Sequence, residues 1–262
     1  MHALDSLRGA WRPGTRELAA AGLGRRRWFS EGQSLFAVDG QHAVLITGGL
    51  VKVTLPGTAG PGAAARDKAS ILLSIRGPGE LVGEEAAIYD EVSPVDTAGP
   101  GAGRLRVTGL TAGTARVFPV KQLRRFLLEH PAVLWPVAAG LCERLADAEA
   151  RIASAARDNA DCRLARLLCD LERYGAADRG DNGDMPGTRI PFQLTQAELT
   201  SWIGSCRETV DRTLTRWRRR GIISTRYRTI VVHDLETLAR IAGIQVRRRA
   251  YGIADGRTGR TA

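Results

Sequence analysis

Apolar and polar positions divide the chain into a β-rich first part and a helical second part. Across residues 28–119, short apolar runs alternate with Gly, Pro and Asp, a pattern that predicts many short strands. Strands at such regular spacing favour a sandwich or a barrel. The runs are 34–38, 43–46, 50–55, 70–75 and 105–110. Segments 56–66 and 93–103 are rich in Gly, Ala and Pro and are predicted to be long loops.

A long helical pattern begins after a short predicted helix at 121–129, which stops before Pro131. Its apolar or small residues recur in alternating steps of four and three. They are Leu134, Ala138, Leu141, Leu145, Ala148, Ile152 and Ala155, continuing to Asn159 and Cys162. A seam of about four heptads predicts a parallel homodimer. The alternative is that this stripe packs on the β-rich part of its own chain.

The helical part continues with a predicted helix at 162–174, which ends at Gly175. Segment 176–188 contains several Gly and Asp residues and is predicted to be a surface loop. Beyond Gly243 the chain is rich in Arg and Gly, and we expect disorder at least from Gly252 onward.

Two short helices joined by a Gly-Ser turn are predicted between these segments. Thr195 and Glu198 form a capping box, so the first helix should begin at Gln196 and stop at Gly204. Ser205 and Glu208 suggest a second capping box. The second helix then turns Val210, Leu214 and Trp217 inward. Its outward positions are Glu208, Asp211, Arg212, Thr215 and Arg219, with Arg207 in the first turn.

A basic hairpin is predicted directly after the second helix. Apolar residues 222–223 and 230–232 flank residues 224–229, which include Arg226, Tyr227 and Arg228. Such a wing beside a recognition helix places cations on DNA phosphates. An Arg of the helix can span two acceptors of guanine, and a Glu can accept from cytosine. The pattern therefore predicts a winged helix-turn-helix that binds double-stranded DNA.

Composition agrees with an anionic partner. The net charge is +10, and residues 159–262 carry 19 Arg against 12 acidic residues, whereas residues 1–158 carry 19 basic against 16 acidic residues. Only three basic residues are Lys, so an arginine-rich coding bias also contributes. No apolar run approaches membrane-span length and no signal-peptide pattern occurs, so we expect a cytoplasmic protein without membrane contact.

The sequence gives no sign of a metal site or an enzyme. Cys142, Cys162, Cys169 and Cys206 lack the spacing of a zinc or iron-sulfur site and are predicted to be free thiols. No nucleophile-base pair or phosphate-binding glycine loop is recognisable.

The segment from Leu194 to Arg212 resembles the helix-turn-helix of the Crp/Fnr transcription regulators, with Arg-Glu-Thr-Val-Asp-Arg as its most specific part. The resemblance implies base reading by Arg207, Glu208 and Arg212. It also implies phosphate contacts by Thr195, Cys206, Thr209, Arg226 and Arg228.

Residues 45–53 and 77–84 are similar to the family's cyclic-nucleotide-binding jelly roll. The expected fold is therefore α+β: an N-terminal jelly roll, a long dimerisation helix and a C-terminal winged helix-turn-helix. We expect an extension at 1–27, the sensor domain at 28–130, the dimer helix at 131–161, the DNA-binding domain at 162–245 and a basic tail at 246–262. RNA polymerase is a further expected partner of such a homodimer.

Control by a cyclic nucleotide is weakly supported by the residues. Gly83 and Glu84 match the family's ribose-binding pair, but no Arg-Ser pair follows to hold the phosphate, unless Arg104 substitutes for it. Ala148 and Glu149 occupy helix positions where hydroxyl groups are expected. No cofactor is therefore assigned, and a degenerate or altered ligand specificity is expected.

Other roles remain as alternatives. A cyclic-nucleotide receptor could act mainly through protein contacts. An oxygen-sensing iron-sulfur cluster is disfavoured because no Cys precedes Cys142, whereas haem ligation by one of the four His residues stays open: His2, His42, His130 and His233.

Overall fold

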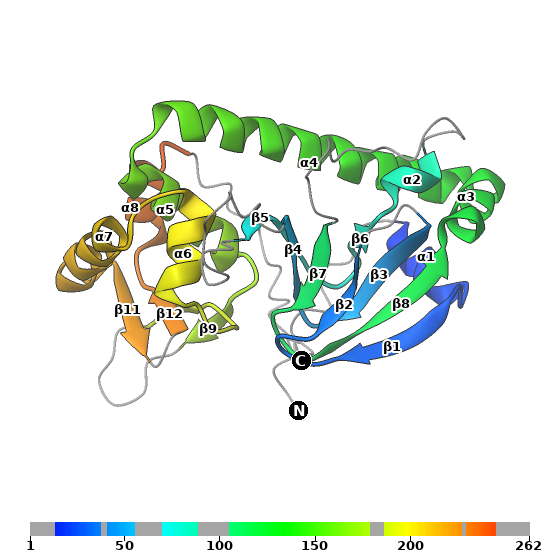
Figure 1. Cartoon of the computed structure of the whole chain (residues 1–262), viewed down its shortest axis with the longest axis horizontal. Coiled ribbons are helices and arrows are strands. Elements are labelled where there is room, and N and C mark those ends of the chain that lie inside the picture. The colour runs from blue at the N-terminus through cyan, green and yellow to red at the C-terminus, as the bar shows by residue number, and fades with distance from the viewer. Residues whose placement is uncertain are drawn as a thin grey trace, which may run out of the picture.

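The computed structural model describes residues 14–37, 41–55, 70–88, 105–178, 186–226 and 229–244. Two domains lie under one long helix, α4, which runs along both of them (Figure 1). The predicted loops at 56–66 and 93–103 and the C-terminal tail lie wholly outside the described residues. The α+β fold class predicted from the sequence is confirmed.

The first domain is a jelly roll of two four-stranded antiparallel sheets, with strand orders β1-β8-β3-β6 and β2-β7-β4-β5. The strands are β1 (Arg25–Phe29), β2 (Ser34–Ala37), β3 (His42–Gly48), β4 (Val51–Leu55), β5 (Ile71–Arg76), β6 (Leu81–Val82), β7 (Arg106–Gly109) and β8 (Gly113–Pro119). The five apolar runs of the sequence all contribute to strands. Strands β1, β6 and β8 were not individually predicted, because β1 is largely exposed and β6 has two residues.

Strand β3 shows why this part of the chain forms a two-sided core. Side chains alternate across a strand. Ala43 and Leu45 belong to the apolar cluster that contains helices α3 and α4. Val44 and Ile46 belong to a second cluster, between the sheets. All four side chains are fully buried, which explains a continuous apolar run instead of an alternating one.

Four helices accompany the sheets: α1 (Thr15–Ala20), α2 (Glu85–Ile88), α3 (Val120–Glu129) and α4 (Pro131–Arg157). The heptad seam was predicted to run to Asn159 and Cys162, and this extension is wrong. The backbone of Asp158 is extended, and the Asn159 side chain accepts a hydrogen bond from the Cys162 amide at 2.9 Å. Asn159 therefore begins a new helix, because its side chain satisfies an otherwise unpaired N–H.

The second domain contains α5 (Ala160–Glu172), β9 (Ala176–Asp178), β10 (Gly187–Arg189), α6 (Gln196–Ile203), α7 (Arg207–Arg219), β11 (Ile223–Arg226), β12 (Thr229–Val232) and α8 (Leu235–Ile241). Its four strands form one sheet in the order β11-β12-β10-β9. The loop predicted at 176–188 was wrong at both ends, where β9 and β10 lie. Thr188 pairs with Val232, a register that polar composition cannot predict.

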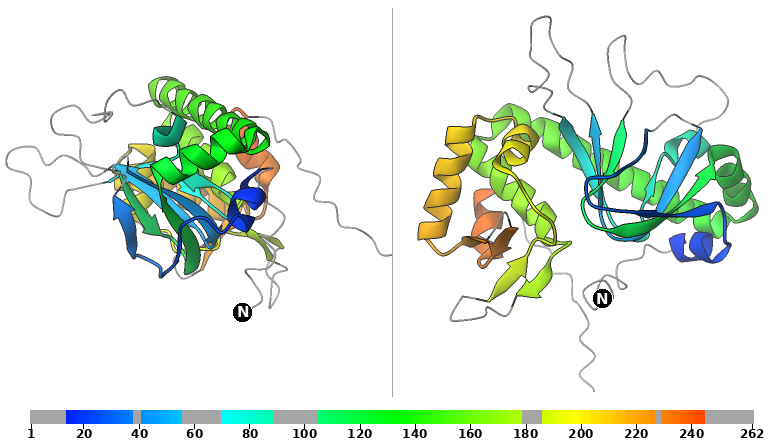
Figure 2. Two further views of the ribbon diagram at one scale, coloured as in Figure 1. Left: turned by 90° about the vertical axis from the view of Figure 1, so that its right-hand side faces the viewer. Right: turned by 60° about the horizontal axis from the view of Figure 1, so that its bottom comes forward.

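An apolar core continues from one domain into the other. Leu50, Ile75 and Leu110 of the jelly roll belong to the same buried cluster as Leu168 and Trp217 of the second domain. The right-hand view of Figure 2 shows the second domain beside the side of the jelly roll that carries β4 and β5. Among the described residues, no helix is long and apolar enough to cross a membrane, and no group of three potential metal ligands occurs.

Candidate DNA-binding surface and effector cavity

Helix α6 begins where the sequence predicted, at a complete capping box. The Thr195 side chain accepts a hydrogen bond from the Glu198 amide at 3.1 Å, and the Thr195 amide donates to Glu198 Oε2 at 3.1 Å. The helix ends at Gly204, whose φ of 59° lies in the left-handed region. Leu199 and Ile203 are buried, which fixes the inward face of α6.

Helix α7 begins one residue later than a Ser205 cap would allow, and the second predicted capping box is wrong. Cys206 is the N-cap residue, and no side chain caps the helix. Ser205 instead belongs to the end of α6, because its amide donates to the Thr200 carbonyl at 3.1 Å. The two helices are therefore joined by a turn in which Ser205 completes the first helix.

Two faces of α7 differ sharply in burial. Val210, Thr213, Leu214 and Trp217 are buried. The opposite face is exposed at Arg207, Glu208, Asp211, Arg212 and Arg219. In Figure 1, α7 lies at the end of the molecule farthest from the jelly roll. The three residues predicted to read bases, Arg207, Glu208 and Arg212, are thus brought together on one accessible surface.

Gln196 connects the two helices of the motif and was not singled out from the sequence. Its side-chain carbonyl accepts from Arg207 Nε at 3.1 Å, and its amide nitrogen donates to Asp211 Oδ1 at 3.0 Å. The amide therefore orients a predicted base-reading arginine. The sequence could have indicated this role only through the polar residue at the first position of α6. Which side chains Gln196 contacts depends on the angle between α6 and α7.

The wing is attached to α7 by a further arginine. Arg218 donates to Thr215 on α7 at 2.7 Å and to Thr225 on β11 at 3.3 Å. A groove of about 440 Å³ lies between α6, α7 and the wing, with Gln196 and Arg207 in its lining. This arrangement leaves a cationic concave surface beside the exposed face of α7.

The residues predicted to contact phosphates lie around this surface. Thr195 and Thr209 are partly exposed at the starts of α6 and α7, while Cys206 and Arg226 are exposed. The Cys206 sulfur and the Thr209 hydroxyl lie 3.0 Å apart in a hydrogen bond, which lowers the pKa of the thiol. Arg228 lies outside the described residues.

The predicted ligand pair, Gly83 and Glu84, occupies a turn beside α4. Gly83 has φ 83°, and a Cβ there would lie 2.6 Å from the His42 carbonyl oxygen, so the turn requires glycine. Glu84 is 1% exposed and forms an ion pair with Arg144 of α4. Its second carboxylate oxygen, Oε2, has no hydrogen-bond partner among the described residues. Arg144 was not predicted, and Arg104 lies outside the described residues.

A cavity of about 430 Å³ lies against this ion pair, between the jelly roll and helices α4 and α5. Ala148 lines it, as the sequence suggested, and offers no hydroxyl group. Arg76 also lines it, and burial lowers the pKa of its guanidinium. Beyond Glu84, the charged side chains of the lining are Arg76, Glu85, Arg144, Asp147, Arg151, Asp170 and Arg173. Among the described residues, the lining therefore carries four arginines and four carboxylates.

Comparison with known proteins agrees with this geometry. Residues 162–241 match the Crp-like helix-turn-helix domain. The chain is 28% identical over 217 residues to a CRP-like cAMP-activated global transcriptional regulator of Mycobacterium tuberculosis, covering 82% of this chain and 86% of the relative.

Two solved structures are also similar to this chain. A CRP-family transcriptional regulator from Thermus thermophilus has a TM-score of 0.59 at 25% identity, over 84% of this chain and 96% of its own. The c-di-GMP-responsive regulator CLP of Xanthomonas campestris has a TM-score of 0.60 at 20% identity, over 84% of this chain and 98% of its own, which shows the shared fold.

The winged helix-turn-helix with its exposed polar face defines this protein as a DNA-binding transcription regulator. The jelly roll, the long helix and the Crp-like domain define it further. Residues 162–241 are a Crp-like helix-turn-helix domain, and over most of its length the chain is similar to the Crp/Fnr transcription regulators.

Proposed function

We propose that this chain forms a homodimer that binds a specific, two-fold-related DNA operator and responds to an effector other than a simple cyclic mononucleotide. The observation that carries the proposal is the exposed face of α7, which presents Arg207, Glu208 and Arg212 while the opposite face packs in the core. An α-helix fits the major groove, where these side-chain types read bases.

The proposed phosphate contacts surround the reading face. Thr195 and Cys206 are the N-cap residues of α6 and α7, positions where backbone N–H groups favour an anion. Thr209 lies in the first turn of α7, and exposed Arg226 lies on the wing. Contacts to phosphate fix the protein on the duplex without reading its sequence.

The proposed dimer forms along α4. Leu145 and Ile152 of the predicted seam are 62% and 72% exposed in the single chain, and Trp135 on the same helix is 75% exposed. Large apolar side chains at this exposure and at heptad spacing are typical of a helix pair. Val133 and Val137, outside the seam, are the buried contacts of α4 with the jelly roll, and Leu134 at the start of the seam packs partly against the same cluster. Packing on the jelly roll therefore does not account for the exposed seam residues Leu145 and Ile152.

The proposed effector site is the cavity beside Glu84. One oxygen of this buried carboxylate lacks a partner among the described residues, so a ligand hydroxyl or amino group that donates a hydrogen bond would satisfy it. Ala148 lines the cavity without a hydroxyl group, and the described part of the lining carries as many carboxylates as guanidinium groups, so it offers no excess positive charge for a cyclic phosphate.

Selection of bound duplexes from a random DNA pool tests the proposal. The unmodified protein should enrich a two-fold-related sequence. Arg212→Ala should relax the preference at one base position of each half-site, at a cost of about 1–3 kcal/mol. Arg226→Ala should weaken binding to all duplexes alike and reduce the salt dependence. Unaltered binding by both variants would refute the assignment.

The dimer and the effector require separate measurements. Sedimentation equilibrium should give a dimer, and Ile152→Glu should give a folded monomer, because opposed carboxylates would lie in the seam. A monomeric unmodified protein would contradict the dimer.

Calorimetric titration with cyclic AMP, cyclic GMP and cyclic di-GMP addresses the effector: tight binding of cyclic AMP or cyclic GMP would contradict the altered specificity. Such binding without any selected DNA would favour a receptor that acts through protein contacts.

A further inference from the structure

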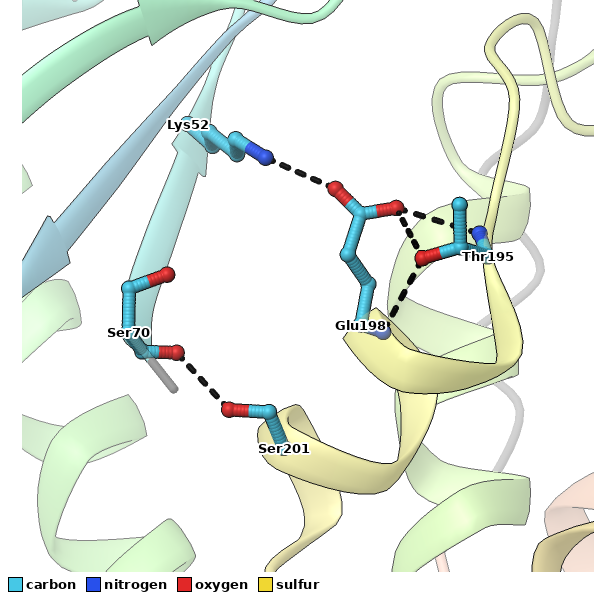
Figure 3. Close-up of polar contacts among 5 residues, drawn as sticks. All are labelled: Lys52, Ser70, Thr195, Glu198 and Ser201. Carbon is cyan, nitrogen blue, oxygen red and sulfur yellow. Dashed lines mark hydrogen bonds and ion pairs between the residues drawn. The ribbon is translucent and has the colours of Figure 1, made fainter. Parts of the chain in front are cut away.

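Polar contacts join the jelly roll directly to the first helix of the helix-turn-helix. Lys52 of β4 donates from Nζ to Glu198 Oε1 at 2.8 Å, and its ammonium lies 5.8 Å from the centre of the Trp202 ring. The Ser201 hydroxyl donates to the carbonyl of Ser70, directly before β5, at 2.9 Å. Figure 3 shows the two hydrogen bonds side by side, and we call Lys52, Ser70, Glu198 and Ser201 the clasp.

The clasp reaches the start of the DNA-binding motif through Glu198. The carboxylate uses Oε1 for Lys52 and Oε2 for the amide and hydroxyl of Thr195, at 3.1 and 2.9 Å (Figure 3). One side chain thus caps α6 and also fixes it to β4. Burial raises the pKa of Glu198, but the hydrogen bonds from Lys52 and Thr195 outweigh it and lower the pKa below its ordinary value.

Further contacts between the two domains accompany the clasp. The Tyr174 hydroxyl, which follows α5, donates to the Ile75 carbonyl of β5 at 3.0 Å. Leu50 and Ile75 pack in the same apolar cluster as Leu199 of α6. The side chains of Lys52 and Glu198 are 20% and 28% exposed. The ion pair therefore lies at the margin of an apolar contact between the two domains.

The strands that carry the clasp also line the effector cavity. Val53, next to Lys52 on β4, and Leu72, Ser74 and Arg76 on β5 lie in its lining. Successive side chains of a strand point to opposite faces, so β4 presents Val53 to the cavity and Lys52 to α6. A movement of these strands would be transmitted to α6 without passing through α4.

We propose that the clasp fixes the angle at which the jelly roll holds α7, and that it thereby sets the half-site spacing that the dimer accepts. The proposal rests on the DNA-binding function proposed above and makes Lys52 and Ser201 positioning residues. In a symmetric dimer each α7 reads one half-site, so a fixed angle on both sides selects one distance between half-sites.

The test measures binding to duplexes that carry two selected half-sites at centre-to-centre spacings of about 9–13 base pairs, and to a duplex with one half-site. Lys52→Met keeps the apolar stem and removes the cation, and Ser201→Ala removes one donor. Both should bind the preferred spacing about three- to tenfold more weakly, while other spacings and the single half-site change less than about twofold. Lys52→Arg, which keeps a cation at this position, should retain the spacing preference that Lys52→Met loses.

Lys121→Met is the matched control, since Lys121 is exposed on α3. Circular dichroism confirms that each variant is folded. An unchanged spacing profile in both Lys52→Met and Ser201→Ala overturns the proposal, as does an equal loss on the single half-site. Tighter binding of the variants also overturns it, because the clasp would then hold α7 away from DNA.

Failure of the proposed function gives a different result. If the unmodified protein enriches no sequence, the DNA-binding function fails and the clasp has no role in spacing. If it enriches a two-fold site that Arg212→Ala weakens, and the spacing profile is nevertheless the same in the clasp variants, only the clasp proposal fails.

Discussion

Replacing Arg144 by Met should destabilise the jelly roll, because it leaves a buried carboxylate without its cation. The Glu84 side chain is 2% exposed and the Arg144 side chain 20% exposed, so solvent can replace little of the lost interaction. Breaking a buried ion pair by removing one partner costs about 3–5 kcal/mol. Because Arg144 is partly exposed, we expect the lower end, about 3 kcal/mol of unfolding free energy.

The double variant Glu84→Gln/Arg144→Met separates the ion pair from simple loss of packing. Glu84→Gln alone should cost about 1 kcal/mol, because the amide oxygen still accepts from Arg144. The double variant should cost less than the sum of the single changes, with a coupling free energy of about 2 kcal/mol. Urea unfolding, followed by far-UV circular dichroism at one protein concentration, measures all four proteins.

Arg125→Met is the control, because Arg125 pairs with Glu129 on the exposed surface of α3 at 2.9 Å. Loss of that pair should change the unfolding free energy by less than about 0.5 kcal/mol. The reasoning is refuted if Arg144→Met costs less than about 1 kcal/mol, or if the costs of the two single changes simply add. Either result would mean that water reaches the Glu84 carboxylate.

Three further outcomes are expected. Gly83→Ala should cost at least about 2 kcal/mol in urea unfolding, since it combines a positive φ with a clash against the neighbouring backbone; a neutral change would contradict this. Gln196→Ala should weaken specific DNA binding about three- to tenfold in a mobility-shift assay by releasing Arg207; unchanged affinity would show that Arg207 needs no orientation. The pKa of Glu198 is lower in the folded protein than in the unfolded chain, where a carboxyl has a pKa of about 4.3. The ionised Glu198 therefore stabilises the folded protein fully above that pH, and this stabilisation is lost as pH falls through the pKa of the folded state. The stability difference between the unmodified protein and Lys52→Met should therefore shrink below about pH 4, and a constant difference would contradict the ion pair.

The sequence by itself determined the local elements of the DNA-binding motif. The start of α6 at Gln196, its end at Gly204 and the inward face of α7 follow from capping residues and helical periodicity, which act within one or two turns. The exposure of Arg207, Glu208 and Arg212 follows from the same periodicity. The apolar runs of the jelly roll were predictable for the same reason, since the apolar residues of a strand show which of its faces are buried.

Some element boundaries were predicted wrongly, one because a local cap was overlooked and others because they depend on a distant partner. The sequence continued the heptad seam past residue 157, whereas the Asn159 side chain begins a new helix there. Strands β9 and β10 lie in a segment of loop-like composition and become strands by pairing, β10 with the distant β12 and β9 with β10. A backbone hydrogen bond to a distant strand can outweigh weak local preference.

Only the tertiary structure decided which polar groups meet. Glu84 and Arg144 lie 60 residues apart, and Lys52 and Glu198 lie 146 residues apart. Their contacts depend on how the jelly roll, α4 and α6 pack together, because side-chain hydrogen bonds need partners within about 3 Å. Local pattern thus specified the surface proposed to read DNA, while the packing of two domains decided the environment of the proposed effector cavity and the clasp that joins it to that surface.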